Sequence, residues 1–308
     1  MDTKHLLVTG GTGFIGQVLI NEALAKNIHC TVLTRDAKHA HTLLPANVTL
    51  VESLQDISAS QPIEWVINLA GESLVNHRWN EQTKVKFIES RLKVTQALID
   101  WIASRGSPPE ALINSSAIGW YGDMGEEALH ENSLYHDEFI HELCEKWEAV
   151  AKQAEAAGVG VCCMRTGLVL GHGGAMKSML PAYKLGMGGS LGSGEQWWSW
   201  IHIQDLVRLY LFSAENKISG VVNGTAPHPV RQKHFAKILG KVLHRPSVIK
   251  TPSVVLKLVL GEFAEALLLH GQQVLPCVAQ QKGFTFDYPE LEQALQEVVS
   301  EPELKQAS

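Results

Sequence analysis

A glycine-rich turn near the N-terminus constrains the fold of this chain more than any other stretch. The apolar run at residues 5–9 leads into Gly10, Gly11, Thr12, Gly13, Phe14, Ile15 and Gly16, after which an amphipathic helical pattern begins. This order predicts a strand, a tight turn and a helix. Gly10 permits the turn, Gly13 lets backbone N–H groups approach a pyrophosphate, and Gly16 lets the helix pack closely on the strand.

The start of that helix is a predicted phosphate site. Its first N–H groups have no intrahelical partners and carry partial positive charge, and both properties favour an anion. We therefore place residues 10–16 in a cofactor site. The alternative is a glycine-rich turn that holds no ligand, but a position after a strand and before a helix favours the first interpretation.

The second predicted strand, at residues 30–33, ends just before Arg35 and Asp36. At this point a dinucleotide-binding fold contacts the adenosine ribose. An acidic residue there accepts hydrogen bonds from a 2′-hydroxyl, whereas an arginine pairs with a 2′-phosphate. Arg35 therefore favours NADP(H) over NAD(H). The alternative makes Asp36 the ribose contact and Arg35 a solvated surface residue.

Strands and helices alternate along the first half of the chain. Further strands are predicted at residues 48–51, 64–69, 111–115 and 159–164, and helices at 14–26, 80–105 and 138–157. This alternation predicts an α/β fold with a Rossmann doubly wound parallel sheet. Ligands of such sheets bind at the carboxyl ends of the strands. The residues we place at that edge are Gly10, Arg35, Ser116 and the cofactor segment Leu69, Ala70, Gly71 and Glu72, in which small residues leave room for a ligand.

The composition changes after residue 170. Residues 171–194 are glycine-rich around a predicted helix, and tryptophans follow at positions 197, 198 and 200. We predict a Rossmann domain over residues 1–170, to which about 200–225 return, and a small C-terminal α/β lobe with a tail over 171–308. The tryptophans form either a pocket wall or a core. His202 and Asp205 either contact the substrate or stabilise the start of a helix. In the second case Asp205 is the helix cap and His202 packs beside it.

Charge and cysteine use exclude several classes of protein. The net charge of −6 supplies no basic field for nucleic acid. The five cysteines are scattered and lack paired metal spacing, so we expect a reducing compartment, no disulfide framework and no metal. The most apolar stretch, residues 253–271, contains Lys257, Glu262 and Glu265 and is too charged to span a bilayer. These features predict a cytoplasmic protein with a small-molecule substrate and no membrane partner.

Five motifs occur in a recognisable order. They are TGGTGFIG at the glycine turn, NLAG at 68–71, SSAIGWYG at 115–122, MRTGLVLG at 164–171 and WIHIQDL at 200–206. With them the chain resembles the extended short-chain dehydrogenase/reductases. More closely, it is similar to the atypical YfcH-like subgroup labelled "epimerase family protein", over almost its whole length. The resemblance implies an NADP-binding Rossmann domain and a small C-terminal lobe of unknown role.

The chain departs from that superfamily where its proton chemistry resides. Active members use a tyrosine as general acid or base and a lysine four residues later that lowers its pKa and holds the nicotinamide ribose. Aligned on Glu148, this chain has Ile140 and Cys144 at those positions. A cysteine in place of the lysine is a feature that this chain shares with the atypical subgroup. A second shared feature is an arginine, here Arg91, where the superfamily usually has an asparagine. Cys144 is either a thiol acid with a lowered pKa or a small buried residue.

Other residues could replace the missing pair. Ser116 resembles the upstream serine of the superfamily, although an ungapped alignment to Tyr121 puts Ala117 there. Tyr121 follows the fifth strand and could reach the nicotinamide, with Arg91 or Arg165 as the nearby cation, and Arg165 is also a predicted cofactor contact. The candidate catalytic residues are Ser116, Tyr121, Cys144 and Arg91.

Two functions follow from these residues. The first is an NADP(H)-dependent protein of epimerase, dehydratase or reductase type that acts on an unknown small polar metabolite with an altered proton donor. The second is a catalytically inactive NADP(H) sensor or binding protein, because the tyrosine and lysine are missing. By resemblance to extended members, a homodimer would form through the helices at 80–105 and 138–157.

Overall fold

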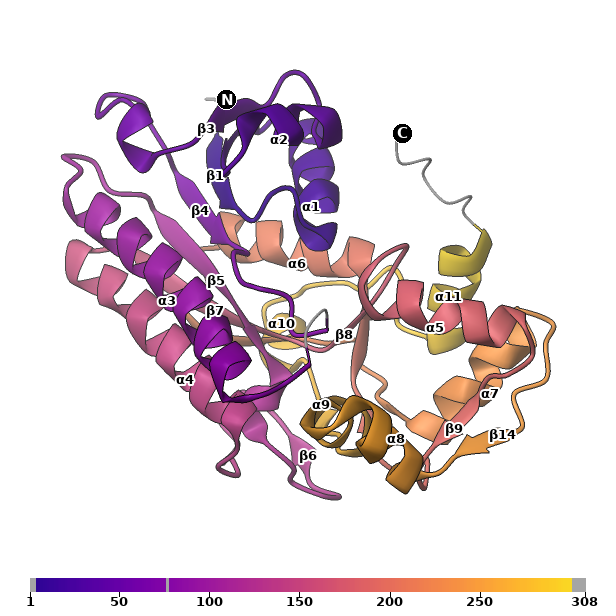
Figure 1. Ribbon diagram of the computed structural model, residues 1–308. Helices are drawn as coiled ribbons and strands as arrows, with labels where there is room; N and C mark the ends of the chain where they lie inside the picture. The colour runs from indigo at the N-terminus through magenta and orange to yellow at the C-terminus, as the bar shows by residue number, and fades with distance from the viewer. Residues whose placement is uncertain (1–3, 76–77, 301–308) are drawn as a thin grey trace.

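A seven-stranded parallel sheet forms the centre of the molecule. The computed structural model describes residues 4–75 and 78–300 (Figure 1). The strand order is β12-β7-β5-β4-β1-β2-β3. The bounds are β1 His5–Thr9, β2 His29–Leu33, β3 Thr49–Val51, β4 Trp65–Asn68, β5 Ala111–Ala117, β7 Gly160–Thr166 and β12 Gly220–Gly224. The predicted Rossmann sheet is confirmed.

Helices cover both faces of this sheet. On one face lie α3 (Glu81–Ala103) and α4 (Phe139–Lys152), and on the other lie α1 (Phe14–Ala25) and α6 (Ile203–Glu215) (Figure 1). Successive side chains of a strand point to opposite faces. In β1, Leu6 and Val8 pack into the core beneath α1 and α6, and Leu7 packs into the core beneath α3. A strand buried on both faces explains the unbroken apolar run seen in the sequence.

The glycine turn has the geometry that its sequence predicts. Gly10 has a φ of +69°, and its carbonyl accepts a hydrogen bond from the Gly13 N–H at 3.0 Å. A Cβ at Gly10 would lie 2.8 Å from the carbonyl carbon and oxygen of Leu69, at the end of β4. A Cβ at Gly16 would lie 2.4 Å from the Gly10 oxygen. The turn therefore needs glycine at both positions.

The C-terminal lobe has its own small core. It contains α5 (Gly174–Lys184), β9 (Gly189–Leu191), α7 (Gln232–Val242), β14 (Ile249–Thr251), α8 (Ser253–Leu260) and α11 (Leu291–Ser300). Trp198 and Trp200 are buried in this core beside Phe235, so these two tryptophans are core residues. Trp197 is half-buried, with the Arg231 guanidinium carbon 3.9 Å from its ring centroid. The division of the chain at residue 170 stays a prediction.

Several short elements were absent from the sequence-based prediction. They are α2 (Ala37–Leu43), η1 (Leu54–Asp56), η2 (Ile118–Tyr121), β6 (Ala128–Leu129), β8 (Leu168–Leu170), β10 (Trp197–Trp198), β11 (Trp200–His202), β13 (Val230–Arg231), β15 (Gln273–Val274) and α10 (Cys277–Gln281). Stretches predicted as helix contain three further short elements, namely η3 (Gln153–Ala157), α9 (Glu262–Ala264) and the π-helical turn η4 (Glu265–Leu269). Within residues 4–75 and 78–300, no helix has the length and apolarity needed to cross a membrane.

Replacing Gly16 by alanine tests the close packing of the turn. The added Cβ meets backbone atoms that cannot move aside cheaply, so we expect a loss of about 1–3 kcal/mol in the free energy of unfolding. The matched control is Gly106→Ala, because a Cβ at Gly106 meets nothing within 4 Å. Chemical denaturation of both variants gives the comparison. Equal stabilities would contradict the packing role of Gly16.

Candidate functional site

A cavity of about 280 Å³ lies at the carboxyl ends of β1, β4, β5 and β7. We call it the carboxyl-edge pocket. Among its lining residues are nine of the predicted site residues, namely Gly10, Gly13, Phe14, Ile15, Gly16, Leu69, Arg91, Ser116 and Cys144. The remainder are Leu74, Ser115, Ala117, Ile140, Leu143, Trp147, Thr166 and Tyr210. The pocket thus joins the glycine turn to the positions where the superfamily carries its proton chemistry.

The glycine end of the pocket suits a phosphate. Gly13 is the N-cap of α1 and makes no side-chain capping hydrogen bond, so first-turn N–H groups of the helix stay available to an anion. The carbonyl of Thr12 accepts a hydrogen bond from Gln17 Nε2 at 2.8 Å, which fixes the turn. Gly11 is buried, and a Cβ there would lie 2.7 Å from Val32 Cγ1. Gly11 and Thr12 therefore shape the turn without lining the pocket.

Arg35 and Asp36 follow β2 in the order the sequence predicts. Arg35 is exposed directly after the strand. Asp36 is the N-cap of α2, and its Oδ1 accepts a hydrogen bond from the His39 N–H at 2.9 Å. The Asp36 carboxylate is thus engaged by the helix that begins beside it. This engagement favours Arg35 over Asp36 as the ribose contact. Arg35 does not line the carboxyl-edge pocket, and its pairing with a 2′-phosphate stays a prediction.

The segment after β4 runs over Arg91. Asn68 Oδ1 accepts a hydrogen bond from the Ala70 N–H at 3.3 Å, and the Glu72 N–H donates to Ser90 Oγ at 3.0 Å. A Cβ at Gly71 would lie 3.0 Å from the Arg91 Cζ atom. A side chain at position 71 would therefore press on Arg91, whose guanidinium would have to shift by a few tenths of an ångström. The predicted cofactor contact at Gly71 stays a prediction.

Arg91 is a buried cation with an unused donor. Its side chain lines the pocket with 9% relative exposure. Nη1 donates to the Phe87 carbonyl at 3.0 Å, and Cζ lies 5.1 Å from the centroid of the Trp147 ring. Nε is buried and has no hydrogen-bond partner in the described part of the chain. Burial lowers the pKa of this guanidinium. A buried N–H of this kind is stabilised by a ligand that accepts its hydrogen bond.

The two substituted superfamily positions both face the pocket. Ile140 and Cys144 lie on α4 with relative exposures of 4% and 1%. Burial raises the pKa of the Cys144 thiol to about 11, and hydrogen bonds with the Ala117 backbone and the Ser116 side chain act in the opposite direction. The thiol is therefore protonated at neutral pH. The expectation of a thiol acid with a lowered pKa is therefore wrong, and Cys144 has the burial expected of the alternative, a small buried residue.

Glu148 and Arg165 form a buried ion pair. Arg165 Nε donates to Glu148 Oε1 at 2.9 Å and Nη2 donates to Oε2 at 3.0 Å, while both side chains are 3% exposed. Ser116 Oγ donates to the same Oε1 at 2.7 Å. The Arg165 Cζ atom also lies 3.4 Å from the centroid of the Trp120 ring. Arg165 does not line the pocket, because Glu148 and Trp120 engage its guanidinium. Arg165 Nη1 is buried and has no hydrogen-bond partner among the described residues, so the role of Arg165 as a cofactor contact stays a prediction.

Tyr121 points away from the pocket. It is fully buried, its hydroxyl donates to Asn223 Oδ1 at 2.8 Å, and burial raises its pKa. The tyrosine that lines the pocket is Tyr210 on α6, whose hydroxyl lies 2.7 Å from Ser115 Oγ. Sequence reasoning missed Tyr210 because its position within an apolar helix marks it as a core residue. Tyr210 and Ser115 are 95 positions apart in the sequence, and only the folded chain brings them together.

A buried polar network under the strand ends was also missed. Asn68 Nδ2 donates to Asn114 Oδ1 at 2.6 Å and to Thr95 Oγ1 at 2.9 Å, and Thr9 Oγ1 donates to Asn68 Oδ1 at 2.5 Å. Trp147 Nε1 donates to the Thr95 hydroxyl at 2.9 Å. This network ties β1, β4 and β5 to α3 and α4. The sequence signal that could have revealed this network is the polar residue near the end of each of these predicted strands.

The WIHIQDL motif at residues 200–206 connects α6 to later segments of the chain. His202 is the N-cap of α6, and its Nε2 lies 2.6 Å from Glu297 Oε2. The Asp205 carboxylate accepts hydrogen bonds from the backbone N–H groups of Asp287 at 2.8 Å and Tyr288 at 2.9 Å. The expected capping role of Asp205 is wrong, since His202 is the cap and Asp205 anchors a later segment. Neither residue lines the pocket.

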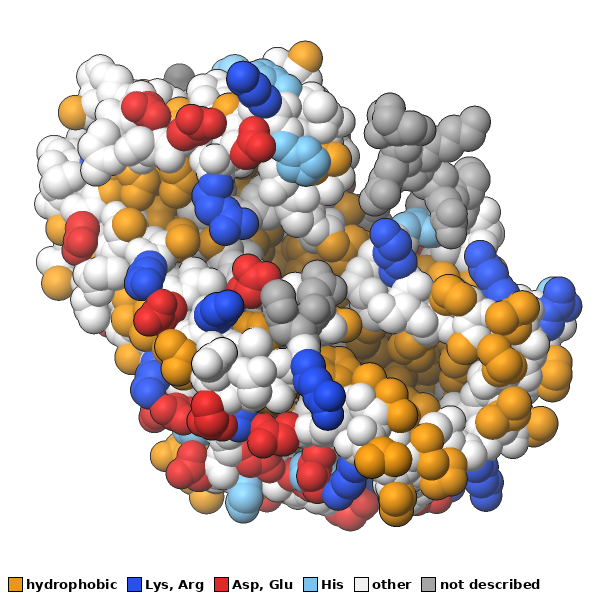
Figure 2. All heavy atoms as spheres, viewed as in Figure 1, with side chains coloured by type: hydrophobic (Ala, Val, Ile, Leu, Met, Phe, Trp, Pro, Cys, Tyr) orange, Lys and Arg blue, Asp and Glu red, His pale blue; other side chains and the backbone are white. Residues whose placement is uncertain are grey.

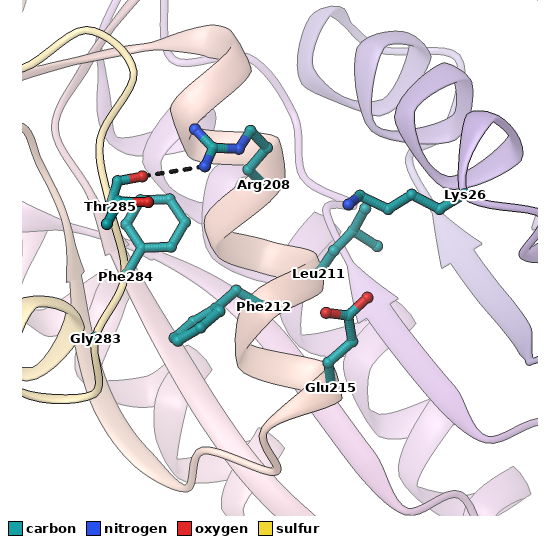
Figure 3. A pocket seen from close by; sticks show the side chains of 8 residues that line it. All are labelled: Lys26, Arg208, Leu211, Phe212, Glu215, Gly283, Phe284 and Thr285. Carbon is teal, nitrogen blue, oxygen red and sulfur yellow. Dashed lines mark hydrogen bonds between the residues drawn. The ribbon is translucent and has the colours of Figure 1, made fainter.

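A second, smaller cavity of about 120 Å³ lies between α6, the end of α1 and residues 283–285 (Figure 3). In it Arg208 Nη2 donates to the Thr285 carbonyl at 3.1 Å. Lys26 and Glu215 extend over its rim in the same view. None of the predicted site residues lines this cavity, so it lies apart from the candidate site.

Comparisons with known proteins identify the family. Residues 6–225 match the NAD dependent epimerase/dehydratase family, and residues 251–298 match a domain of unknown function, DUF1731. The chain therefore belongs to the NAD dependent epimerase/dehydratase family. The second match covers part of the C-terminal lobe, to which the sequence alone assigned no role.

Two relatives and one solved structure show the subgroup. An epimerase family protein of Staphylococcus aureus is 38% identical over 97% of this chain and 100% of its own length. The chloroplastic SDR39U1 homolog of Arabidopsis thaliana is 39% identical over 95% and 86%. Human epimerase family protein SDR39U1, crystallised with NADPH, has a TM-score of 0.86 and 34% identity, covering 96% of this chain and 98% of that one. The chain is thus an atypical short-chain dehydrogenase/reductase, and the NADPH of the human structure supports the expected cofactor.

Replacing Glu148 by glutamine tests the buried ion pair. The variant leaves the Arg165 charge buried without its counter-ion, so we expect a loss of about 3–5 kcal/mol in the free energy of unfolding. The control is Glu89→Gln, which breaks an exposed pair with Lys93 and should cost under about 1 kcal/mol. Urea denaturation of both variants measures the difference. A loss in Glu148→Gln as small as the control's would contradict this account.

Proposed function

We propose that this protein binds NADP(H) in the carboxyl-edge pocket. One observation carries the proposal: a single cavity connects the uncapped start of α1 to Arg91, Ser116 and Cys144. In this arrangement residues 10–16 hold the diphosphate and Arg35 pairs with the 2′-phosphate. The free Nε of Arg91 donates to a cofactor oxygen, which satisfies the buried donor. The residues present therefore fit the cofactor.

We further propose that the protein is an oxidoreductase or an epimerase-like enzyme acting on a small polar metabolite. The cofactor, when bound, supplies hydride chemistry. The pocket is lined by the hydroxyls of Ser115, Ser116, Thr166 and Tyr210 and by the thiol of Cys144. Of these, Ser116 and Cys144 occupy predicted catalytic positions, and Ser116 is already bonded to the Glu148 carboxylate. These residues are the candidate proton donors. Arg91 is the candidate for the cation that the superfamily's lysine provides.

The alternative is a non-catalytic NADP(H) sensor. It is favoured by a contact between the pocket wall and the DUF1731 segment. Phe263 packs on Trp79 with a centroid distance of 6.0 Å, within the cluster that contains Ile140 and Cys144. Occupancy of the pocket could thereby change the tail. Steady NADPH consumption with a carbonyl or sugar-nucleotide substrate, lost in Cys144→Ser, would exclude the sensor.

Location and assembly are also proposals. The free cysteines suit a reducing compartment such as the cytoplasm. Helices α3 and α4 lie side by side on one face of the sheet (Figure 1), where they are available to a second copy. A homodimer through these two helices remains a proposal.

A titration with NADPH and NADH tests the cofactor proposal. Trp147 lines the pocket, so binding should quench tryptophan fluorescence. We expect tighter binding of NADPH, and a rise of about tenfold or more in its Kd in Arg35→Ala because a charged hydrogen bond is lost. The control Lys282→Ala removes an exposed cation in the lobe and should leave both constants unchanged. Failure of the wild-type protein to bind NADPH would overturn the proposal.

Alkylation of Cys144 tests the nicotinamide end of the pocket. Because burial raises its pKa to about 11, iodoacetamide labelling of Cys144 should be slow at neutral pH and rise about tenfold per pH unit over the accessible range. Saturating NADPH should slow this labelling further. Half-buried Cys277, outside the pocket, is the internal control and should be labelled first, with no protection. Mass-spectrometric peptide mapping reads both sites, and equal NADPH effects on the two cysteines would contradict the placement.

A further inference from the structure

An exposed apolar face lies on the C-terminal lobe. We call it the α8 face and define it by Leu185, Met187, Val248, Ile249, Val254, Val255, Leu258 and Val259, all exposed. Leu258 is 79% and Val248 is 81% exposed. Figure 2 shows hydrophobic side chains gathered at the lower right, over the region where Figure 1 places α8, β9 and β14. Aliphatic side chains grouped in this way on a surface mark an interaction site.

The parts of the face are held together by the fold. Strand β14 pairs with β9, with Ile249 opposite Gly189, and α8 follows β14 after one residue. Arg245 Nε donates to the Lys184 carbonyl at 3.0 Å, which joins the last residue of α5 to the loop before β14. The eight apolar side chains therefore belong to one continuous part of the lobe.

This part of the chain is basic in a protein of net charge −6. Residues 237–260 contain Lys237, Lys241, Arg245, Lys250 and Lys257 and no aspartate or glutamate. Two of these cations are balanced from elsewhere, because Lys241 pairs with Glu292 at 2.6 Å and Lys257 pairs with Glu265 at 2.7 Å. Arg245 and Lys250 are exposed on the loop and strand that carry Val248 and Ile249. The α8 face thus combines aliphatic side chains with flanking positive charge.

Charge selects among the possible occupants. A twofold dimer through this face would bring the cations of two copies into one interface, which is unfavourable. An anionic lipid surface has the complementary chemistry. Its headgroups attract lysine and arginine, while valine and leucine side chains enter the boundary between headgroups and acyl chains. Against the sequence-based expectation of no membrane partner, we propose that the α8 face docks this protein peripherally on a surface of anionic lipids.

The docked face is linked to the candidate site. The chain continues from α8 into α9, where Glu262 Oε2 lies 2.6 Å from Lys84 Nζ at the start of α3. Next to it Phe263 packs against Trp79, in the same cluster as Cys144. The lobe surface that would meet lipid is therefore joined directly to a wall of the carboxyl-edge pocket. This proposal does not depend on cofactor binding or on catalysis.

Vesicle flotation of the full-length protein tests the proposal. We expect the protein to float with vesicles of phosphatidylcholine and phosphatidylglycerol at low salt, and to stay behind with phosphatidylcholine alone or at high salt. Leu258→Ser and Lys250→Glu should each lose most of the bound fraction. The matched controls are Leu134→Ser, which changes a leucine that is 77% exposed elsewhere, and Lys282→Glu. Both controls should bind as the wild type does.

Three results would overturn the proposal. They are absence of flotation, equal binding to neutral and anionic vesicles, and equal losses in Leu258→Ser and Leu134→Ser. Light scattering adds a further outcome, since a dimer that Leu258→Ser dissociates would assign the face to self-association instead. Thermal melts and NADPH titrations of every variant show that folding and the pocket are unchanged, so a failure here is distinguishable from a failure of the proposed function.

Discussion

The close approach of the glycine turn to the end of β4 is the constraint on which the candidate site depends. Gly10 lies so near the Leu69 carbonyl that any side chain there would overlap the backbone. This contact sets the start of α1 at the carboxyl edge of the sheet. Because β1 has buried side chains on both faces, neither the strand nor the turn can shift without exposing one of two cores. The glycine end of the pocket is therefore rigid.

The opposite end of the pocket is fixed by buried polar groups. The Glu148–Arg165 pair and the Ser116 hydroxyl join α4 to β5 and β7. Replacing the superfamily's tyrosine and lysine with Ile140 and Cys144 leaves an apolar wall with one protonated thiol. Positive charge enters instead from α3, through Arg91. A pocket built in this way keeps the means to hold a dinucleotide while changing which group can give up a proton.

Long elements could be predicted from the sequence, whereas two-residue strands could not. The apolar run at residues 5–9 is β1 to the residue, because a strand buried on both faces has an unbroken apolar pattern. Strands β6 and β15 have only two residues each, and they exist because the fold places residues 128–129 beside 273–274. Two residues carry no periodicity. Contacts across 145 positions of sequence therefore leave no local signal to find.

By itself the sequence determined the sheet and the glycine-rich turn, because each follows from local spacing and residue type. The substituted positions Ile140 and Cys144 came from its resemblance to the superfamily. Only the tertiary structure decided which side chains face the pocket. Tyr121 and Arg165 flank predicted strands as Ser116 does, yet Asn223 and Glu148 draw them into the interior. Arg91 faces the pocket with a free Nε. Side-chain direction depends on partners distant in sequence, and only the folded chain brings those partners together.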